Sequence, residues 1–301
     1  MTFSLAVPAL AKIFLYLLVV VLAAAVISPP AYWLFHAQLD FPFYRYFSRI
    51  AQIAAIVLLG PLLLWLRVRS FAEFGLSRNP RKYRDLAAGF FLAFLPVLLL
   101  GAGYLWFGLY KVKPELLPGV LVRIALTACV VAAVEEFLFR GVLLGLSVRA
   151  LGRIPAAVGV SLIFAAVHFL KPAKLPDATV SWWSGFAQIP RVAGNLPPAE
   201  LLAGGFLSLV VVGLILSLAA LRTRSLFLPI GLHAGWVFGQ QGLQWLAKSR
   251  IRPEDALLPW IGPNVVSGAV PTGIVPLGLL LLTGGMVWFY LRDATASPDR
   301  S

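Results

Sequence analysis

Eight long apolar runs constrain this chain more than any other feature of its sequence. Each is close to the roughly 20 residues that a helix needs to cross a bilayer. A backbone in hydrocarbon must make its hydrogen bonds within its own segment, so the runs predict helices. We therefore expect an all-α fold: a single polytopic transmembrane domain over residues 1–301 with about eight transmembrane helices. The runs are 13–35, 50–66, 86–110, 124–148, 154–170, 201–221, 225–247 and 271–291.

The composition excludes a soluble globular enzyme. Hydrophobic residues make up 60% of the chain and charged residues 12%, whereas a soluble domain is nearer half apolar and one-quarter charged. The net charge of +13 would suggest nucleic acid as the partner of a soluble protein. Here the basic residues lie between apolar runs, which favours a bilayer with anionic headgroups as the partner and no nucleic acid. The single cysteine, Cys129, excludes an internal disulfide and a Cys-rich zinc site.

The distribution of Lys and Arg predicts the orientation. The connection between the second and third runs is the most basic, so the positive-inside rule places it and both termini in the cytoplasm. No short apolar run near the N-terminus ends in a small-residue cleavage site, so the first run is expected to stay as a span. We expect an integral, multi-pass protein, with the cell (inner) membrane favoured.

The connection 171–200 is long enough to be more than a linker. Aromatic residues in it, including Trp182, Trp183 and Phe186, lie near basic residues. A helix on the membrane surface, or a flap at the interface, is one interpretation. An aromatic belt that anchors the neighbouring spans is the favoured one.

Only two of the 12 acidic residues, Glu135 and Glu136, lie inside an apolar run. A charge near the middle of a bilayer costs at least ~2.5 kcal/mol on insertion scales, so two adjacent acids need a physical reason. Arg140 follows Glu136 by four residues on the same helix face and is predicted to pair with it. Glu135 points about 100° away around the helix, so it is available for chemistry.

Two histidines, His168 and His233, lie within the fifth and seventh runs. One histidine in an apolar helix usually makes an interhelical hydrogen bond, but two histidines and a second carboxylate indicate a site. A carboxylate and an imidazole can together deprotonate water, and a second imidazole can donate to an oxyanion. Alternatively, Glu135, His168 and His233 could hold a metal that activates the water. Both chemistries suggest hydrolysis of an amide.

Other intramembrane protease designs fit this chain poorly. No Asp lies in a run, which excludes a paired-aspartate site, and no His-Glu-x-x-His zinc motif occurs. The nearest match to Gly-x-Ser-Gly, at 182–185, lacks its first glycine. Cys129 is seven residues from Glu136, but no histidine close in the sequence could activate it, so we interpret it as a small core residue.

Three short motifs lie on three of the runs. They are Glu135-Glu136-Phe137-Leu138-Phe139-Arg140 followed by Gly141, Phe164-Ala165-Ala166-Val167-His168, and Gly231-Leu232-His233-Ala234-Gly235-Trp236. In order and spacing they resemble the CPBP intramembrane proteases, which include type II CAAX prenyl endopeptidases, bacteriocin-immunity relatives and lysostaphin resistance protein A-like proteins. The resemblance covers residues 124–240, and the Phe-Gly-Leu at 74–76 resembles a further family segment.

The resemblance implies an intramembrane endopeptidase whose catalytic core is that segment. Glu135 and His168 would activate the water, and His233 would help to bind the oxyanion. The supporting residues would be Glu136, Arg140 and Phe164. The substrate would be a membrane-associated protein or peptide, with CAAX-type prenylated proteins as one class. Catalysis by glutamate and histidine without a metal is favoured, and zinc held by Glu135, His168 and His233 is the alternative.

One position departs from the family pattern. Asn or Asp often follows the last histidine by four residues, and here that position is Val237. The change removes an expected polar group and weakens a metal site; Gln240 and Gln241, two turns after His233, are candidate replacements. It also supports a different class, a membrane scaffold or immunity protein with a vestigial site. A transporter with Glu135 in a proton relay is a third class, but the sequence shows no inverted repeat.

Overall fold

The computed structural model describes most of the chain. The described residues are 3–68, 70, 72, 76–170, 180–194, 199–252, 255–262 and 273–296. Contacts divide the chain into two compact units: Met1–Ser70 with Ala166–Pro198, and Phe71–Ala165 with Ala199–Ser301. A single domain over 1–301 stays a prediction. The Phe-Gly-Leu segment at 74–76, which resembles a family segment, lies outside the described residues except for Leu76.

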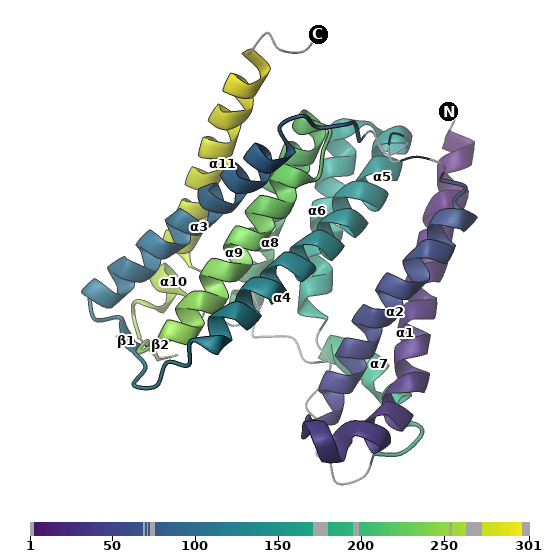
Figure 1. Cartoon of the computed structure of the whole chain (residues 1–301), viewed down its shortest axis with the longest axis horizontal. Helices are drawn as coiled ribbons and strands as arrows, with labels where there is room; N and C mark the ends of the chain where they lie inside the picture. The colour runs from purple at the N-terminus through teal and green to yellow at the C-terminus, as the bar shows by residue number, and fades with distance from the viewer. Residues whose placement is uncertain are drawn as a thin grey trace. The chain divides into compact units, whose positions relative to one another are not determined.

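Helices make up most of the described chain (Figure 1). The elements in chain order are α1 (Phe3–Leu39), α2 (Phe43–Trp65), α3 (Lys82–Trp106), β1 (Tyr110–Val112), α4 (Gly119–Glu136), η2 (Phe137–Leu143), α5 (Leu144–Leu151), α6 (Arg153–Phe169), α7 (Ser184–Gly194), α8 (Ala199–Thr223), α9 (Phe227–Leu246), β2 (Ala247–Ser249), α10 (Leu258–Ile261) and α11 (Ile274–Ala296). Strands β1 and β2 pair antiparallel, with Lys111 opposite Lys248. Apart from this short ribbon, the predicted all-α class is confirmed.

Five helices are long and apolar enough to cross a membrane. Among the described residues these are Ala11–Leu39, Phe43–Trp65, Lys82–Trp106, Leu202–Thr223 and Ile274–Arg292. The other three predicted runs fall on shorter or more polar helices. Helix α6 is a shorter apolar helix, while α4 and α9 contain the acidic, histidine and glutamine side chains around the candidate site. The chain is thus an integral membrane protein, and eight crossings stay a prediction.

Glycines allow α9 to approach α3 closely within the second unit. Gly231 lies against Leu86 and Gly235 against Phe90, and a methyl group at either glycine would overlap the facing carbonyl oxygen. Membrane helices gain packing energy through such close approaches, because lipid supplies no hydrophobic drive between them. Helix α4 also packs against α9 (Figure 1). As a result α9 is largely buried, and it carries His233 into the interior of the unit.

The first unit is built from α1, α2 and α7. Phe186 and Ile189 of α7 pack against a buried cluster on α1 and α2. Gly185 lies so close to the carbonyl group of Ala25 that a methyl group there would overlap it. The connection 171–200 therefore contains a helix, and its location at the membrane surface stays a prediction. Two aromatic side chains remain exposed, as expected of a belt: Trp182 and Trp183.

Cys129 is exposed on α4, so its interpretation as a small core residue is wrong. The buried residues of α4 advance by four along the helix and are Ile124, Ala128, Ala132 and Glu136. Each step of four residues turns the stripe by about 40°, so the stripe drifts around the helix. Cys129 is only about 20° from Glu136 around the helix but about 100° from Ala128, the buried residue next to it, and so falls outside the stripe.

Candidate functional site

The acidic pair lies where α4 changes into a π-helical turn. Glu135 and Glu136 are the last two residues of α4, and Arg140 lies in the middle of η2. Such turns re-aim the side chains that follow them and are frequent at functional sites. Arg140 still reaches back to Glu136 across this turn, so the ion pair predicted from their spacing is present.

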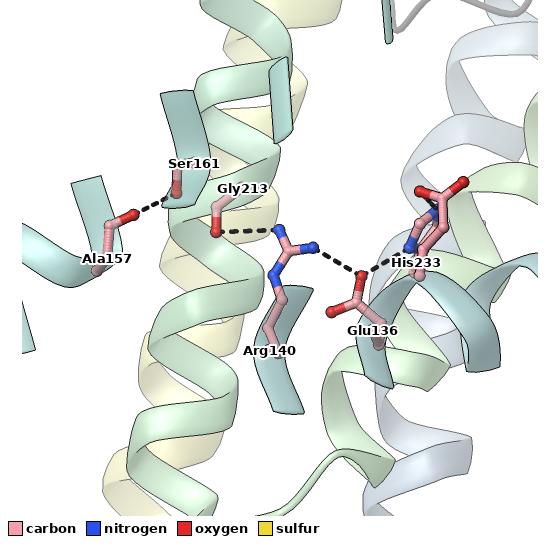
Figure 2. A network of polar contacts seen from close by, with 7 residues as sticks. Glu136, Arg140, Ala157, Ser161, Gly213 and His233 are labelled. Atoms are coloured by element: carbon pink, nitrogen blue, oxygen red, sulfur yellow. Dashed lines mark hydrogen bonds and ion pairs between the residues drawn. The ribbon is translucent and has the colours of Figure 1, made fainter. Parts of the chain in front are cut away.

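One carboxylate oxygen, Oε1 of Glu136, accepts two hydrogen bonds (Figure 2). Nη1 of Arg140 donates one at 2.9 Å, and Nδ1 of His233 donates the other at 2.8 Å. The side chains of Glu136 and Arg140 are completely buried. Removing one partner of a buried ion pair leaves the other charge uncompensated, which costs ~3–5 kcal/mol in soluble proteins.

Arg140 is held from two further directions. Its Nη2 donates to the backbone carbonyl of Gly213 on α8 at 3.4 Å, and the ring of Phe164 on α6 lies 4.4 Å from its Cζ. The negative face of an aromatic ring attracts a guanidinium group. Gly213 packs in turn against Ser161, where a methyl group would not fit (Figure 2). Within the second unit, η2, α8 and the part of α6 that ends at Ala165 therefore meet around this arginine.

Glu135 has a more open environment than Glu136. Its side chain is 29% exposed, and its Oε2 lies 4.0 Å from Nε2 of His233. That distance is too long for a direct hydrogen bond, but a water molecule can bridge it. The two carboxylates therefore face opposite edges of the His233 ring. The exposed fractions favour Glu136 as the structural carboxylate, whereas Glu135 is partly exposed, with its Oε2 buried toward His233.

The hydrogen bond from His233 to Glu136 places a proton on Nδ1 of the ring. Since a carboxylate oxygen only accepts, Nδ1 carries a proton. In a neutral ring Nε2 then has no proton and accepts, whereas in a protonated ring Nε2 donates as well. A protonated ring leaves Glu135, Glu136, Arg140 and His233 together without net charge.

The second unit brings five of the six predicted site residues into one cluster. The Phe164 ring joins the cluster edge-on, with its centroid 6.1 Å from that of His233. The five are Glu135, Glu136, Arg140, Phe164 and His233. His168, the sixth, is half-buried in the last turn of α6 and belongs to the first unit, within which it is described.

Two contacts of the cluster were not predicted from the sequence. The first is the hydrogen bond from Arg140 to the carbonyl group of Gly213. A glycine in an apolar helix signals close packing, but every residue has a backbone carbonyl group, so the sequence does not single out this acceptor. The second is the bond between Glu136 and His233, which lie 97 residues apart. Gln240 and Gln241 are half-buried on α9, and their side chains make no hydrogen bond with the described residues of the cluster.

The cluster offers two side chains to a metal. In the described part of the chain, no group of three His, Cys, Asp or Glu side chains is placed to hold an ion. His233 uses Nδ1 for Glu136, which leaves its Nε2 and the carboxylate of Glu135 as donors. Catalytic zinc takes three protein ligands, and His168 is the residue predicted to supply the third.

These features define a helical membrane protein with a buried carboxylate, histidine and arginine cluster. Residues 117–239 match the family model described as type II CAAX prenyl endopeptidase Rce1-like. The resemblance predicted from the three motifs is therefore confirmed over this segment, which contains all six predicted site residues. No curated protein and no solved structure matches the chain.

Proposed function

We propose that this protein is an intramembrane endopeptidase that hydrolyses a peptide bond of a membrane-associated protein. The observation that carries the proposal is the pair of carboxylates at opposite edges of His233, within the Rce1-like segment. One carboxylate is buried and orients the ring, and the other is partly exposed and can accept a proton. Amide hydrolysis requires a base for the water and a donor for the oxyanion.

In the proposed mechanism Glu135 is the general base, and the family resemblance gives His168 as its partner. Glu135 takes a proton from water, the hydroxide attacks the peptide carbonyl carbon, and the carbonyl oxygen becomes an oxyanion. Protonated His233 donates to this oxyanion from Nε2, because its Nδ1 is already bonded to Glu136. The proton held by Glu135 then passes to the leaving amine as the C–N bond breaks.

A metal is the alternative means of activating the water, with Glu135, His168 and His233 as its ligands. We favour the metal-free version, since Val237 occupies the position of an expected fourth polar group. Chelation distinguishes the two. Activity that survives stringent chelation, with no stoichiometric metal by elemental analysis, supports the metal-free version, whereas loss of activity with rescue by zinc supports the metal site.

The family match supports one substrate class. The matching family is described as CAAX prenyl endopeptidases, so a prenylated protein with a CAAX-type C-terminus is the first substrate to test. Multi-pass insertion in the cell (inner) membrane, with both termini in the cytoplasm, is part of the same proposal.

Cleavage of a membrane-tethered CAAX-type reporter by the full-length protein in proteoliposomes tests the proposal. Glu135→Gln keeps the shape of the side chain and removes the base, so we expect cleavage to fall by about 10²-fold or more at an unchanged melting temperature. The matched control is Glu115→Gln, an exposed acid before α4, which is expected to cleave like the wild type. Cleavage by Glu135→Gln at the wild-type rate would sink the assignment of the base.

A vestigial scaffold or immunity protein is the second candidate, and Val237 is the observation that favours it. It predicts that neither the wild type nor Glu135→Gln cleaves any reporter. Cleavage by the wild type that depends on Glu135 excludes this candidate, and it also excludes a transporter with Glu135 in a proton relay.

A further inference from the structure

A cavity of about 430 Å³ lies in the second unit, apart from the proposed catalytic groups. The segment before α3, the end of α5, the start of α6 and the turn between α8 and α9 border it. Neither Glu135 nor His233 lines it, although Arg140 does. A ligand in this cavity would therefore not occupy the proposed active site.

Three arginines from three different elements line this cavity. They are Arg149 at the end of α5, Arg153 at the start of α6, and Arg224 between α8 and α9. All three residues are exposed, and none of the described residues that line the cavity is acidic. Within the described ranges, none of the three has a carboxylate partner. Guanidinium groups bind phosphate oxygens through paired, charge-assisted hydrogen bonds, so this arrangement fits a phosphate group.

The turn that carries Arg224 is fixed by the segment before α3. The backbone N–H of Ser77 donates to the carbonyl of Arg224 at 2.8 Å, and the side chain of Asn79 donates to Ser225 at 3.1 Å. Arg224 has a φ of 49°, in a left-handed region that residues with a side chain rarely adopt. These bonds hold the turn in place, so binding would need little further ordering of the backbone.

The remaining wall of the cavity is largely apolar and includes Leu76, Leu144 and Val148. An inorganic ion gains nothing from such a wall, whereas the glycerol and acyl carbons of a lipid lose water by packing on it. Arg140, which is buried, also lines the cavity, and its Nε has no hydrogen-bond partner among the described residues. The cavity thus combines a cationic rim with an apolar wall.

We infer that this cavity binds the phosphate of an anionic phospholipid headgroup, with the lipid's glycerol and first acyl carbons against the apolar wall. The cavity is bordered by the connections between the second and third, the fourth and fifth, and the sixth and seventh apolar runs. The distribution of basic residues predicts that these three connections lie in the cytoplasm. The cytoplasmic leaflet is where anionic lipids attract clustered arginines.

The test is a titration of the full-length protein in neutral-detergent micelles, with bound lipid counted by native mass spectrometry. The probes are phosphatidylglycerol, phosphatidylcholine and inorganic phosphate. We expect one phosphatidylglycerol to bind more tightly than phosphatidylcholine, and Arg224→Gln to weaken that binding about tenfold, the factor typical of a charged hydrogen bond. Arg149→Gln with Arg153→Gln should weaken it further.

The matched control is Arg222→Gln, which removes the same charge two residues earlier. Arg222 does not line the cavity, and its guanidinium lies over the ring of Trp288 at 4.7 Å. We expect this variant to bind like the wild type. Equal weakening by Arg222→Gln and Arg224→Gln would mean attraction by net charge alone and would overturn the site. Displacement of the lipid by equimolar inorganic phosphate would overturn its assignment to a lipid.

Discussion

At the level of single residues, Oε1 of Glu136 accepts hydrogen bonds from both Arg140 and His233. One buried carboxylate thereby compensates a buried cation and orients the ring that faces Glu135. Loss of Arg140 would disturb both the fold and the site, whereas loss of Glu135 would disturb only the chemistry.

Arg140→Ala is therefore expected to be strongly destabilising. It leaves the charge of Glu136 buried without its partner, and the cost of breaking such a pair is ~3–5 kcal/mol in soluble proteins. Thermal unfolding of the purified protein measures the effect. The control is Arg123→Ala on α4, an exposed arginine, whose loss should change stability by no more than about 0.5 kcal/mol. Equal melting temperatures for the two variants would show that the ion pair is not structural.

Val237→Asn is expected to raise the rate of cleavage. The residue is half-buried and follows His233 by one helical turn on α9, so an amide there can present a donor to the proposed oxyanion. A single oxyanion donor is worth about 10²–10³-fold in kcat where the geometry is ideal, and we expect at least a tenfold gain. Val237→Leu controls for the change in size. A kcat equal in the two variants would place Val237 outside the oxyanion site.

At the level of elements, the approach of α9 to α3 decides where His233 lies. Gly231→Ala is expected to destabilise the second unit by about 1–3 kcal/mol, the usual cost of an overpacked contact, because its methyl group would overlap Leu86. Gly242→Ala is the control on the same helix. It has no neighbour within 4 Å among the described atoms, and the better helix propensity of alanine should stabilise α9 slightly. The melting temperatures of the two variants should therefore move in opposite directions.

At the level of the whole molecule, the eight predicted crossings place the two termini on one side of the membrane. Cysteine accessibility in vesicles tests this in a Cys129→Ser background. Arg78→Cys lies between the second and third runs and is expected to react only from the cytoplasmic side. Glu115→Cys lies between the third and fourth runs and is expected to react only from the other side. Labelling of both positions from the same side would contradict the predicted order of crossings.

The sequence by itself determined the helices and most of the candidate site. Helices follow from apolar runs because backbone groups in hydrocarbon must bond locally. The pairing of Glu136 with Arg140 follows from a spacing of four on one helix. These are properties of neighbouring residues, and charges within apolar runs are conspicuous because they are costly. The same reasoning failed at Cys129, since it assumed which face of α4 packs inward.

Only the tertiary structure decided which partners meet across the chain. The bond from His233 to Glu136 joins residues 97 positions apart. The other acceptor of Arg140 is the backbone carbonyl of Gly213, which no side chain marks in the sequence. Arg149 and Arg153 lie where α5 ends and α6 begins, and the folding of the second unit brings Arg224, from the turn between α8 and α9, to the same cavity. Helix periodicity places side chains on a face, but the close packing of one helix on another determines which faces meet.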